Sequence, residues 1–161
     1  GIGIDSASYK NDQQALSINL ATGVNTGGQA EGDTLIGIEY VYTGQASDTI
    51  VGDSGSNWLD GGAGNDTLGG GSLDFRNNTT RGDGNDTYLF GRGDGQDTVF
   101  DRDNTVSNLD TVLFKAGVAP QDVQVSREGN DLVFKIAGTT DRITVHRHFD
   151  LGDSQGRWSV R

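Results

Sequence analysis

Gly61-Gly62-Ala63-Gly64-Asn65-Asp66-Thr67-Leu68-Gly69 is the stretch that decides the fold: a glycine-rich turn that ends in an aspartate and leads into a short strand. Glycine lets the backbone take positive φ angles and bring its carbonyl oxygens together. Aspartate adds an anionic oxygen on a short side chain. Calcium takes six to eight oxygen ligands, mostly carbonyls and carboxylates, so such a turn supplies about half of a calcium shell.

The same unit recurs along residues 27–114, with its aspartate taken as position six. Position seven is threonine in every unit except the one with Trp58, and position eight is always apolar or aromatic. Two steps between units are nine residues, and the others are nine plus an insertion. This regularity predicts a solenoid. The sixth positions are Asp33, Asp48, Asn57, Asp66, Asp86, Asp97 and Asp110, and the eighth are Leu35, Ile50, Leu59, Leu68, Tyr88, Val99 and Val112.

Nine residues make a turn and a short strand, so two units close one coil of about 18 residues. Stacked coils place the position-eight side chains in a thin core between two parallel sheets. The expected fold class is therefore all-β, a right-handed parallel β-roll or β-helix. Alternate turns lie on the same side of such a solenoid. We expect one column to hold Asp48, Asp66 and Asp97, and the other to hold Asp33, Asn57, Asp86 and Asp110.

The flanking segments divide the chain into four expected parts. Residues 1–26 hold a partial repeat ending at Asp5 and a strand whose apolar residues alternate around Ile18. Residues 27–114 are the repeat region, with a polar loop insertion at about 72–81. Residues 115–150 form a β-rich cap, and residues 151–161 form a tail without a recognisable pattern.

The cap is expected because the last coil of a solenoid otherwise exposes its core. Three stretches in this part alternate apolar and polar residues, which indicates antiparallel strands joined by turns. These stretches are residues 123–125, 132–136 and 142–145.

Composition narrows the classes of function. The chain has 161 residues, a net charge of −11 and no cysteine, and all but three of its 23 acidic residues are aspartates. This charge excludes nucleic acid as a natural partner and disfavours an anionic membrane surface. No apolar run is long enough to span a membrane. Because the chain is acidic and rich in glycine, we expect it to be disordered unless cations neutralise its carboxylates.

The strings GGAGNDTL (61–68), GDGNDTYLF (82–90) and GDGQDTV (93–99) resemble the repeats of the RTX (repeats-in-toxin) family of hemolysin-type calcium-binding proteins. GNDLVFKI (129–136) and DRITVHRHF (141–149) resemble the C-terminal domain that follows such repeats in this family. The resemblance implies a secreted bacterial protein, a toxin or adhesin, exported by type I secretion machinery. It also implies that the chain is a fragment of a larger protein.

In this family a calcium ion lies between turns two units apart, bound by carbonyls at about positions two and four and by the position-six carboxylate. The resemblance implies roughly three to five ions for this chain. The turn of Asn57 is weaker because an amide adds no charge, and the turns of Asp33 and Asp110 depart from the glycine pattern. The residues of this chain at the family's ligand positions are Gly44, Ala46, Asp48, Asp53, Gly55, Asn57, Gly62, Gly64, Asp66, Gly82, Gly84, Asp86, Gly93, Gly95 and Asp97, and Asp33 and Asp110 are included as ligands of the two turns that depart from the pattern.

These observations predict a non-catalytic module that folds on binding calcium outside the cell. One alternative is the carbohydrate-binding or cell-surface-binding region of an adhesin, suggested by the 72–81 insertion and by Tyr40 and Tyr42. Another is the non-catalytic C-terminal module of a secreted protease, lipase, lyase or epimerase.

Other candidate sites carry weaker signals. His146 and His148 are two residues apart and would lie on the same face of a strand, as two zinc ligands can. No third ligand has matching spacing. We expect them to be structural. Asp94, Asp101 and Asp103 are expected to be solvated acids rather than ligands, and no sequence context suggests a catalytic triad.

Overall fold

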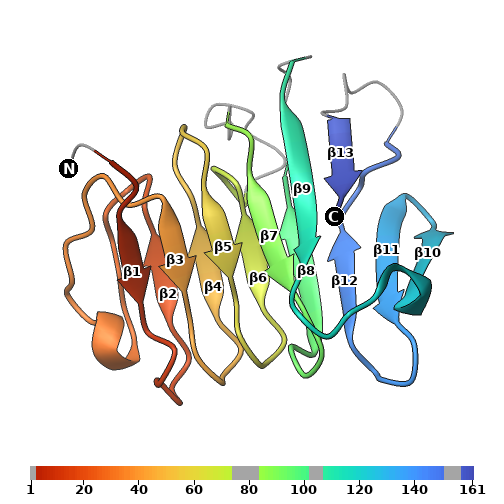
Figure 1. The fold of residues 1–161 in the computed structure, drawn as a ribbon. Coiled ribbons are helices and arrows are strands. Elements are labelled where there is room, and N and C mark those ends of the chain that lie inside the picture. The colour runs from red at the N-terminus through yellow and green to blue at the C-terminus, as the bar shows by residue number, and fades with distance from the viewer. Residues whose placement is uncertain (1–2, 74–83, 102–106, 151–156) are drawn as a thin grey trace.

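The computed structural model describes residues 3–73, 84–101, 107–150 and 157–161. Strands β1 to β9 alternate between two sheets, and the coils stack from the N-terminal strand β1 towards the strands of the C-terminal segment (Figure 1). The expected all-β solenoid is confirmed. Its only helices among the described residues are two 3₁₀ turns, η1 (Gly28–Ala30) and η2 (Pro120–Asp122).

Both sheets are mainly parallel. The first contains, in spatial order, β1 (Ser6–Ser8), β3 (Tyr40–Tyr42), β5 (Trp58–Asp60), β7 (Thr87–Phe90), β9 (Leu109–Phe114) and β13 (Arg157–Val160). The second contains β10 (Val123–Glu128), β11 (Asp131–Ile136), β12 (Arg142–Val145), β8 (Gln96–Phe100), β6 (Thr67–Gly69), β4 (Thr49–Val51) and β2 (Ser17–Asn19).

The register confirms the coil of 18 residues where no insertion intervenes. Thr49 pairs with Thr67, and Tyr40 pairs with Trp58. Every position-eight residue that lies on a strand points inward. The inward residues, all fully buried, are Ile18, Val41, Ile50, Leu59, Leu68, Tyr88, Val99 and Val112. Burial of one such side chain stabilises the fold by about 1.5–3 kcal/mol, and each coil contributes only two of them.

The C-terminal segment continues the second sheet. β12 pairs with β8 in parallel, and β11 and β10 follow in antiparallel register. Phe134, Ile136, Ile143 and Val145 extend the buried core beyond the last repeat. β13 adds to the first sheet beside β9, so part of the tail 151–161, which has no recognisable sequence pattern, is a strand. Together these strands cover both sheets of the last coil.

The first repeat differs from the expectation. The segment around Asp33 and Leu35 is not a strand, Asp33 is exposed, and Leu35 is only half-buried. The strand of this repeat unit is β3 instead, with Val41 buried at position eight and Glu39 at position six. Glu39 lies nine residues before Asp48, so the uninterrupted nonapeptide phase extends back to this glutamate. The assignment of Asp33 to a column is therefore wrong.

No helix within the described ranges is both long and apolar enough to cross a membrane.

Candidate metal centre

Six turn residues form two columns, one at the start of each sheet's repeat strands. Five of them are aspartates, and none is more than 2% exposed. We call these sets the Asp66 column and the Asp86 column. The Asp66 column consists of Asp48, Asp66 and Asp97, and the Asp86 column consists of Asn57, Asp86 and Asp110.

Hydrogen bonds fix the side chains of the Asp66 column. Each carboxylate accepts a bond from the backbone N–H at position six of the preceding coil in the same sheet. The N–H of Leu16 donates to Asp48 Oδ1 at 2.8 Å, that of Asp48 to Asp66 Oδ1 at 2.8 Å, and that of Asp66 to Asp97 Oδ1 at 3.0 Å. The short stem of aspartate places one oxygen on this N–H and directs the other into the turn, as when Asp48 Oδ2 accepts the N–H of Gly44 at 3.2 Å.

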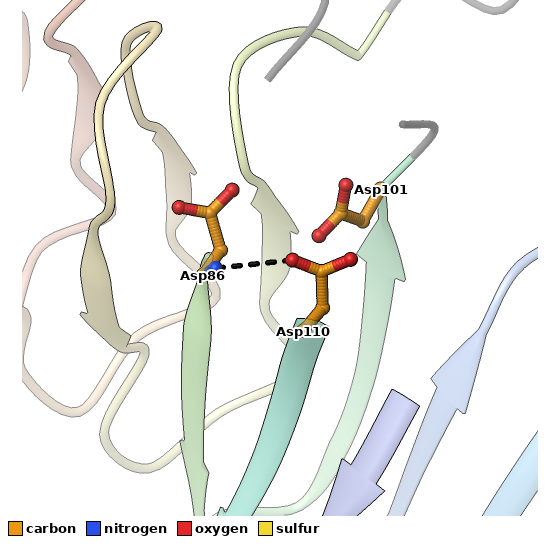
Figure 2. A group of neighbouring side chains, drawn as sticks. All are labelled: Asp86, Asp101 and Asp110. Atoms are coloured by element: carbon orange, nitrogen blue, oxygen red, sulfur yellow. Dashed lines mark hydrogen bonds between the residues drawn. The ribbon is translucent and has the colours of Figure 1, made fainter. Parts of the chain in front are cut away.

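The Asp86 column repeats this arrangement. The N–H of Asn57 donates to Asp86 Oδ1 at 2.8 Å, and the N–H of Asp86 donates to Asp110 Oδ1 at 3.0 Å. Figure 2 shows the second of these bonds. In the first sheet, Asp5 N–H likewise donates to the Glu39 carboxylate at 2.8 Å, so Asp5 and Glu39 continue the pattern towards the N-terminus.

The carboxylates of Asp66 and Asp97 are electrostatically unfavourable as anions. The pKa of Asp66 is raised to about 7, mainly by burial. The hydrogen bond from the Asp48 N–H lowers this pKa, and the charges of Asp48, Asp94 and Asp60 raise it. Burial also raises the pKa of Asp97 to about 8, with Asp66 and Asp94 adding to the effect. Asp66 Oδ2 is buried and accepts no hydrogen bond from any described residue. A cation or a proton is needed to stabilise this site.

The turns stack closely enough to crowd carbonyl oxygens against glycines. A Cβ on Gly62 would lie 2.2 Å from Gly44 O, and one on Gly64 would lie 2.3 Å from Ala46 O. Both glycines also have positive φ, at 79° and 142°. Gly44 O accepts the N–H of Ala63 at 2.9 Å, which leaves its second lone pair for another partner. The turn therefore combines carbonyl and carboxylate oxygens, which is the ligand set that calcium prefers.

Three carboxylates meet at the other side of the solenoid (Figure 2). Asp86, Asp101 and Asp110 each offer an oxygen, and these atoms lie within 4.8 Å of one another. Asp101 is half-buried, and its Oδ2 accepts the hydroxyl of the buried Tyr88 at 2.8 Å. The expectation that Asp101 is a solvated acid is therefore wrong, because the strand end of β8 directs it towards the Asp86 column.

The weaker turn is closed by its own side chains. Asp53 Oδ1 accepts the N–H of Gly55 at 2.7 Å, and Asn57 Oδ1 accepts the N–H of Asp53 at 2.8 Å. A Cβ on Gly84 would lie 2.2 Å from Gly55 O, so the turn of Asp86 stacks on this one. The expected ligand Gly82 lies outside the described residues.

The expected ligands Gly93 and Gly95 contact the C-terminal segment, whereas Asp33 lies near the N-terminus. Gly93 and Gly95 both donate their N–H groups to the buried carboxylate of Asp141, at 2.9 and 3.1 Å. Gly95 O accepts the N–H of Arg142 at 2.9 Å, so this carbonyl takes part in the pairing with β12. Asp33 lies outside both columns and accepts the hydroxyl of Tyr9 at 2.7 Å.

The two histidines contact other groups. His146 Nδ1 lies 3.2 Å from Asp131 Oδ1, and the imidazole packs against Phe100. The His148 ring packs against Phe149, and burial lowers its pKa. Within the described part of the chain, the group of possible metal ligands that gathers three side chains is Asp86, Asp101 and Asp110, which contains no histidine.

Comparison with known proteins finds a family match in the middle of the chain. The sequence model of the RTX calcium-binding nonapeptide repeat, in four copies, matches residues 42–74. A stretch of 74 residues, 46% of the chain, is 34% identical to the iron-regulated protein FrpA of Neisseria meningitidis serogroup C. The alignment covers 6% of FrpA, so the chain spans only a small part of the length of this relative.

Proposed function

We propose, on the premise that this chain carries RTX calcium-binding nonapeptide repeats, that it is a calcium-dependent folding module of a larger secreted protein and has no catalytic role. Calcium, when bound, supplies positive charge and a cross-link between stacked turns. In metal-dependent domains the free energy of binding becomes free energy of folding. The chain's own residues determine where this coupling acts.

Asp66 is the observation that carries the proposal. A carboxylate that is 2% exposed, with one oxygen lacking a hydrogen-bond partner, is costly as an anion. The cost falls when a cation contacts that oxygen. Asp48 and Asp97 lie on either side in the same column, so a ligand at Asp66 also bridges consecutive coils.

Residues for two groups of sites follow from the columns. At the Asp66 column we propose the carboxylates together with the carbonyls of Gly44, Ala46, Gly62 and Gly64. At the other side we propose Asp86, Asp101 and Asp110, with carbonyls of the stacked turns completing the shell. Three carboxylates from different segments fit a hard cation that takes only oxygen ligands.

The affinity for calcium determines whether the chain folds inside or outside the cell. Extracellular calcium modules typically bind at about 10⁻⁴–10⁻³ M. At the much lower calcium concentration inside a cell, repulsion among the carboxylates opposes a core to which each coil adds only two large side chains. The chain would pass through type I secretion machinery unfolded and fold outside the cell.

A calcium titration followed by circular dichroism tests the proposal. The metal-stripped chain at pH 8 is expected to lack most of its β signal and to gain it cooperatively with calcium. Magnesium is the matched control, because it requires near-ideal octahedral geometry and keeps several of its waters. Calorimetry gives the number of ions, expected to be three to five. An equally folded chain in chelator and in millimolar calcium contradicts the proposal.

A second candidate function is recognition of a carbohydrate by the outer face of the first sheet. Tyr40, Tyr42 and Trp58 lie together there, with ring centroids 6.3 Å apart for the two tyrosines and 4.9 Å apart for Tyr40 and Trp58. All three are half-buried, and Lys10 lies 4.0 Å from the centre of the Tyr42 ring. Aromatic faces beside polar groups are typical of sugar-binding surfaces.

A glycan array with the calcium-loaded chain tests this second candidate. Trp58→Ala is expected to abolish any signal. Leu109→Ala, which changes a 36% exposed side chain on the same sheet, is expected to leave it unchanged. Equal signals from the two variants rule out the aromatic cluster as the binding surface.

A further inference from the structure

Lys115 places an ammonium group between two stacked turns of the repeat region. Its Nζ lies 2.5 Å from Asp60 Oδ1 and 2.7 Å from Asp94 Oδ2. Asp60 precedes the turn 61–66, and Asp94 belongs to the turn 91–97 that stacks on it. The two carboxylates are each 7% exposed, and their charges come from different coils.

The backbone is built to admit this side chain. Lys115 directly follows β9, and its N–H donates to Phe90 O at 2.9 Å. A Cβ on Gly91 would lie 2.9 Å from Lys115 Cβ and 3.0 Å from its Cδ. The absence of a side chain at Gly91 therefore lets the lysine stem lie across the turn and reach Asp60, 55 residues earlier in the chain.

The surroundings of the ammonium resemble a cation site. Asp60 Oδ1 also accepts the N–H of Gly62 at 3.1 Å, and Asp94 Oδ2 accepts that of Gly91 at 2.7 Å. A Cβ on Gly61 would lie 2.2 Å from the unpartnered Asp66 Oδ2, so this buried oxygen stands over the residue next to Asp60. The distances from Nζ are close to the 2.3–2.6 Å of calcium–oxygen bonds.

The position in the fold explains why a fixed cation is useful here. The Asp66 column ends at Asp97, because the residue paired with Asp97 in β12 is the buried Ile143. Within the described residues 115–150 the chain leaves the repeat and enters η2 and the strands β10, β11 and β12. Burial lowers the pKa of Lys115, but hydrogen bonds to Asp60 and Asp94 raise it, with a net upward shift that keeps the ammonium charged.

We propose that Lys115 is a built-in cation that occupies a divalent-cation position between the turns of Asp60 and Asp94. It cross-links these coils without calcium, and its removal converts the position into an additional calcium site. The proposal rests on the proposed function for the other turns, but it concerns a position where the native chain does not use calcium.

The test compares Lys115→Met with the native chain and with Lys135→Met. Methionine keeps most of the lysine stem and removes the charge. Lys135 is the matched control, because its ammonium bonds Glu128 at 2.6 Å on the exposed surface of the cap. Equilibrium dialysis at saturating calcium gives the number of bound ions, and circular dichroism with and without calcium gives the folded fraction.

The expected result is one more calcium ion for Lys115→Met than for the native chain and for Lys135→Met. A double variant, Lys115→Met with Asp60→Asn, is expected to lose the additional ion. Native calcium binding with an unchanged ion count in Lys115→Met overturns the Lys115 proposal alone. So does a Lys115→Met chain that stays unfolded at saturating calcium. Failure of the native chain to bind calcium instead contradicts the proposed function.

Discussion

The repeat region and the C-terminal segment manage negative charge in opposite ways. Residues 11–75 contain nine acidic residues and no lysine or arginine, whereas residues 115–161 contain six acidic and seven basic residues. In the repeats the buried carboxylates contact backbone N–H groups and approach one another. In the C-terminal segment Glu128 bonds both Lys135 and Arg142, and Asp122 bonds Arg92 from the turn 91–97.

The difference separates the two kinds of cation that the chain can use. The C-terminal segment carries its own positive charges, so its strands do not depend on a dissolved ion for neutralisation. The repeats up to residue 75 contain no lysine or arginine, so apart from the contact of Lys115 with Asp60 they have to obtain positive charge from solution. Calcium dependence is therefore expected to belong to the repeats, and each of the following experiments asks whether the two regions respond differently.

The largest expected effect is that of pH on the calcium-free chain. The pKa values of Asp66 and Asp97 are raised from 3.8 to about 7 and about 8 in the fold, so the folded chain holds protons that the unfolded chain has released. Their stabilising contribution is fully present below about pH 4 and is lost as pH rises through 7 and 8. The urea midpoint of the metal-stripped protein is expected to fall as pH rises from 5, until at pH 8 most of the chain is unfolded without urea.

Saturating calcium is the control for this pH dependence. Calcium replaces the protons at the columns, so the urea midpoint at pH 8 is expected to rise and the slope with pH to flatten or reverse. A calcium-free chain that is more stable at pH 8 than at pH 5 contradicts the assignment of buried, repelled carboxylates to the repeats.

The next largest effect is expected from glycine substitutions matched in backbone conformation. Gly95 and Gly117 have φ values of 94° and 92°. A Cβ at Gly95 would lie 1.9 Å from Gly64 O, whereas one at Gly117 meets nothing within 4 Å. Gly117→Ala is expected to cost about 1 kcal/mol from backbone strain, and Gly95→Ala about 3 kcal/mol or more because the stacked turns must separate.

Urea unfolding in calcium measures both glycine variants. The difference between them reports the close approach of the turns, since the strain from positive φ is common to both. Equal losses of stability are incompatible with the stacking described for turns 61–66 and 91–97.

Asp66→Asn is expected to have two smaller effects of opposite sign, one on the stability of the calcium-free chain and one on calcium affinity. The amide oxygen still accepts the N–H of Asp48, but the negative charge is lost. The calcium-free chain is expected to become more stable at pH 8, while calcium affinity falls about tenfold, or about 1.4 kcal/mol. Asp122→Asn, which removes a charge that bonds the exposed Arg92, is expected to leave the calcium midpoint unchanged. A similar midpoint shift in both variants argues against a special role for the Asp66 column.

The local repeat made much of the fold predictable. Nine-residue spacing defined the coil, the inward positions of Leu59 and Leu68, and the column of Asp48, Asp66 and Asp97, because each depends only on the phase of the chain. The position of the first repeat unit was predicted wrongly. GDTL at residues 32–35 has the letters of a unit, but a glutamate nine residues before Asp48 holds the true position.

The contacts that the sequence did not reveal join residues far apart and off the repeat. Asp101 follows β8 and meets Asp86 and Asp110 only because β7, β8 and β9 share one coil stack. Asp94, expected to be solvated, is 7% exposed and bonds Lys115. The insertions between coils determine which of these side chains come into contact. The nonapeptide pattern does not determine the geometry of the insertions.

The smallest effect is expected from Glu128→Gln in the C-terminal segment. Glu128 bonds Lys135 at 2.6 Å and Arg142 at 3.2 Å, and the hydrogen bond from Lys135 is the main reason that its pKa is lowered. Exposed ion pairs contribute little to stability because water and salt screen them. The urea midpoint is therefore expected to change slightly, and by the same amount in calcium and in chelator. A loss confined to the calcium-free chain would mean that the C-terminal segment, too, relies on calcium for its charge balance.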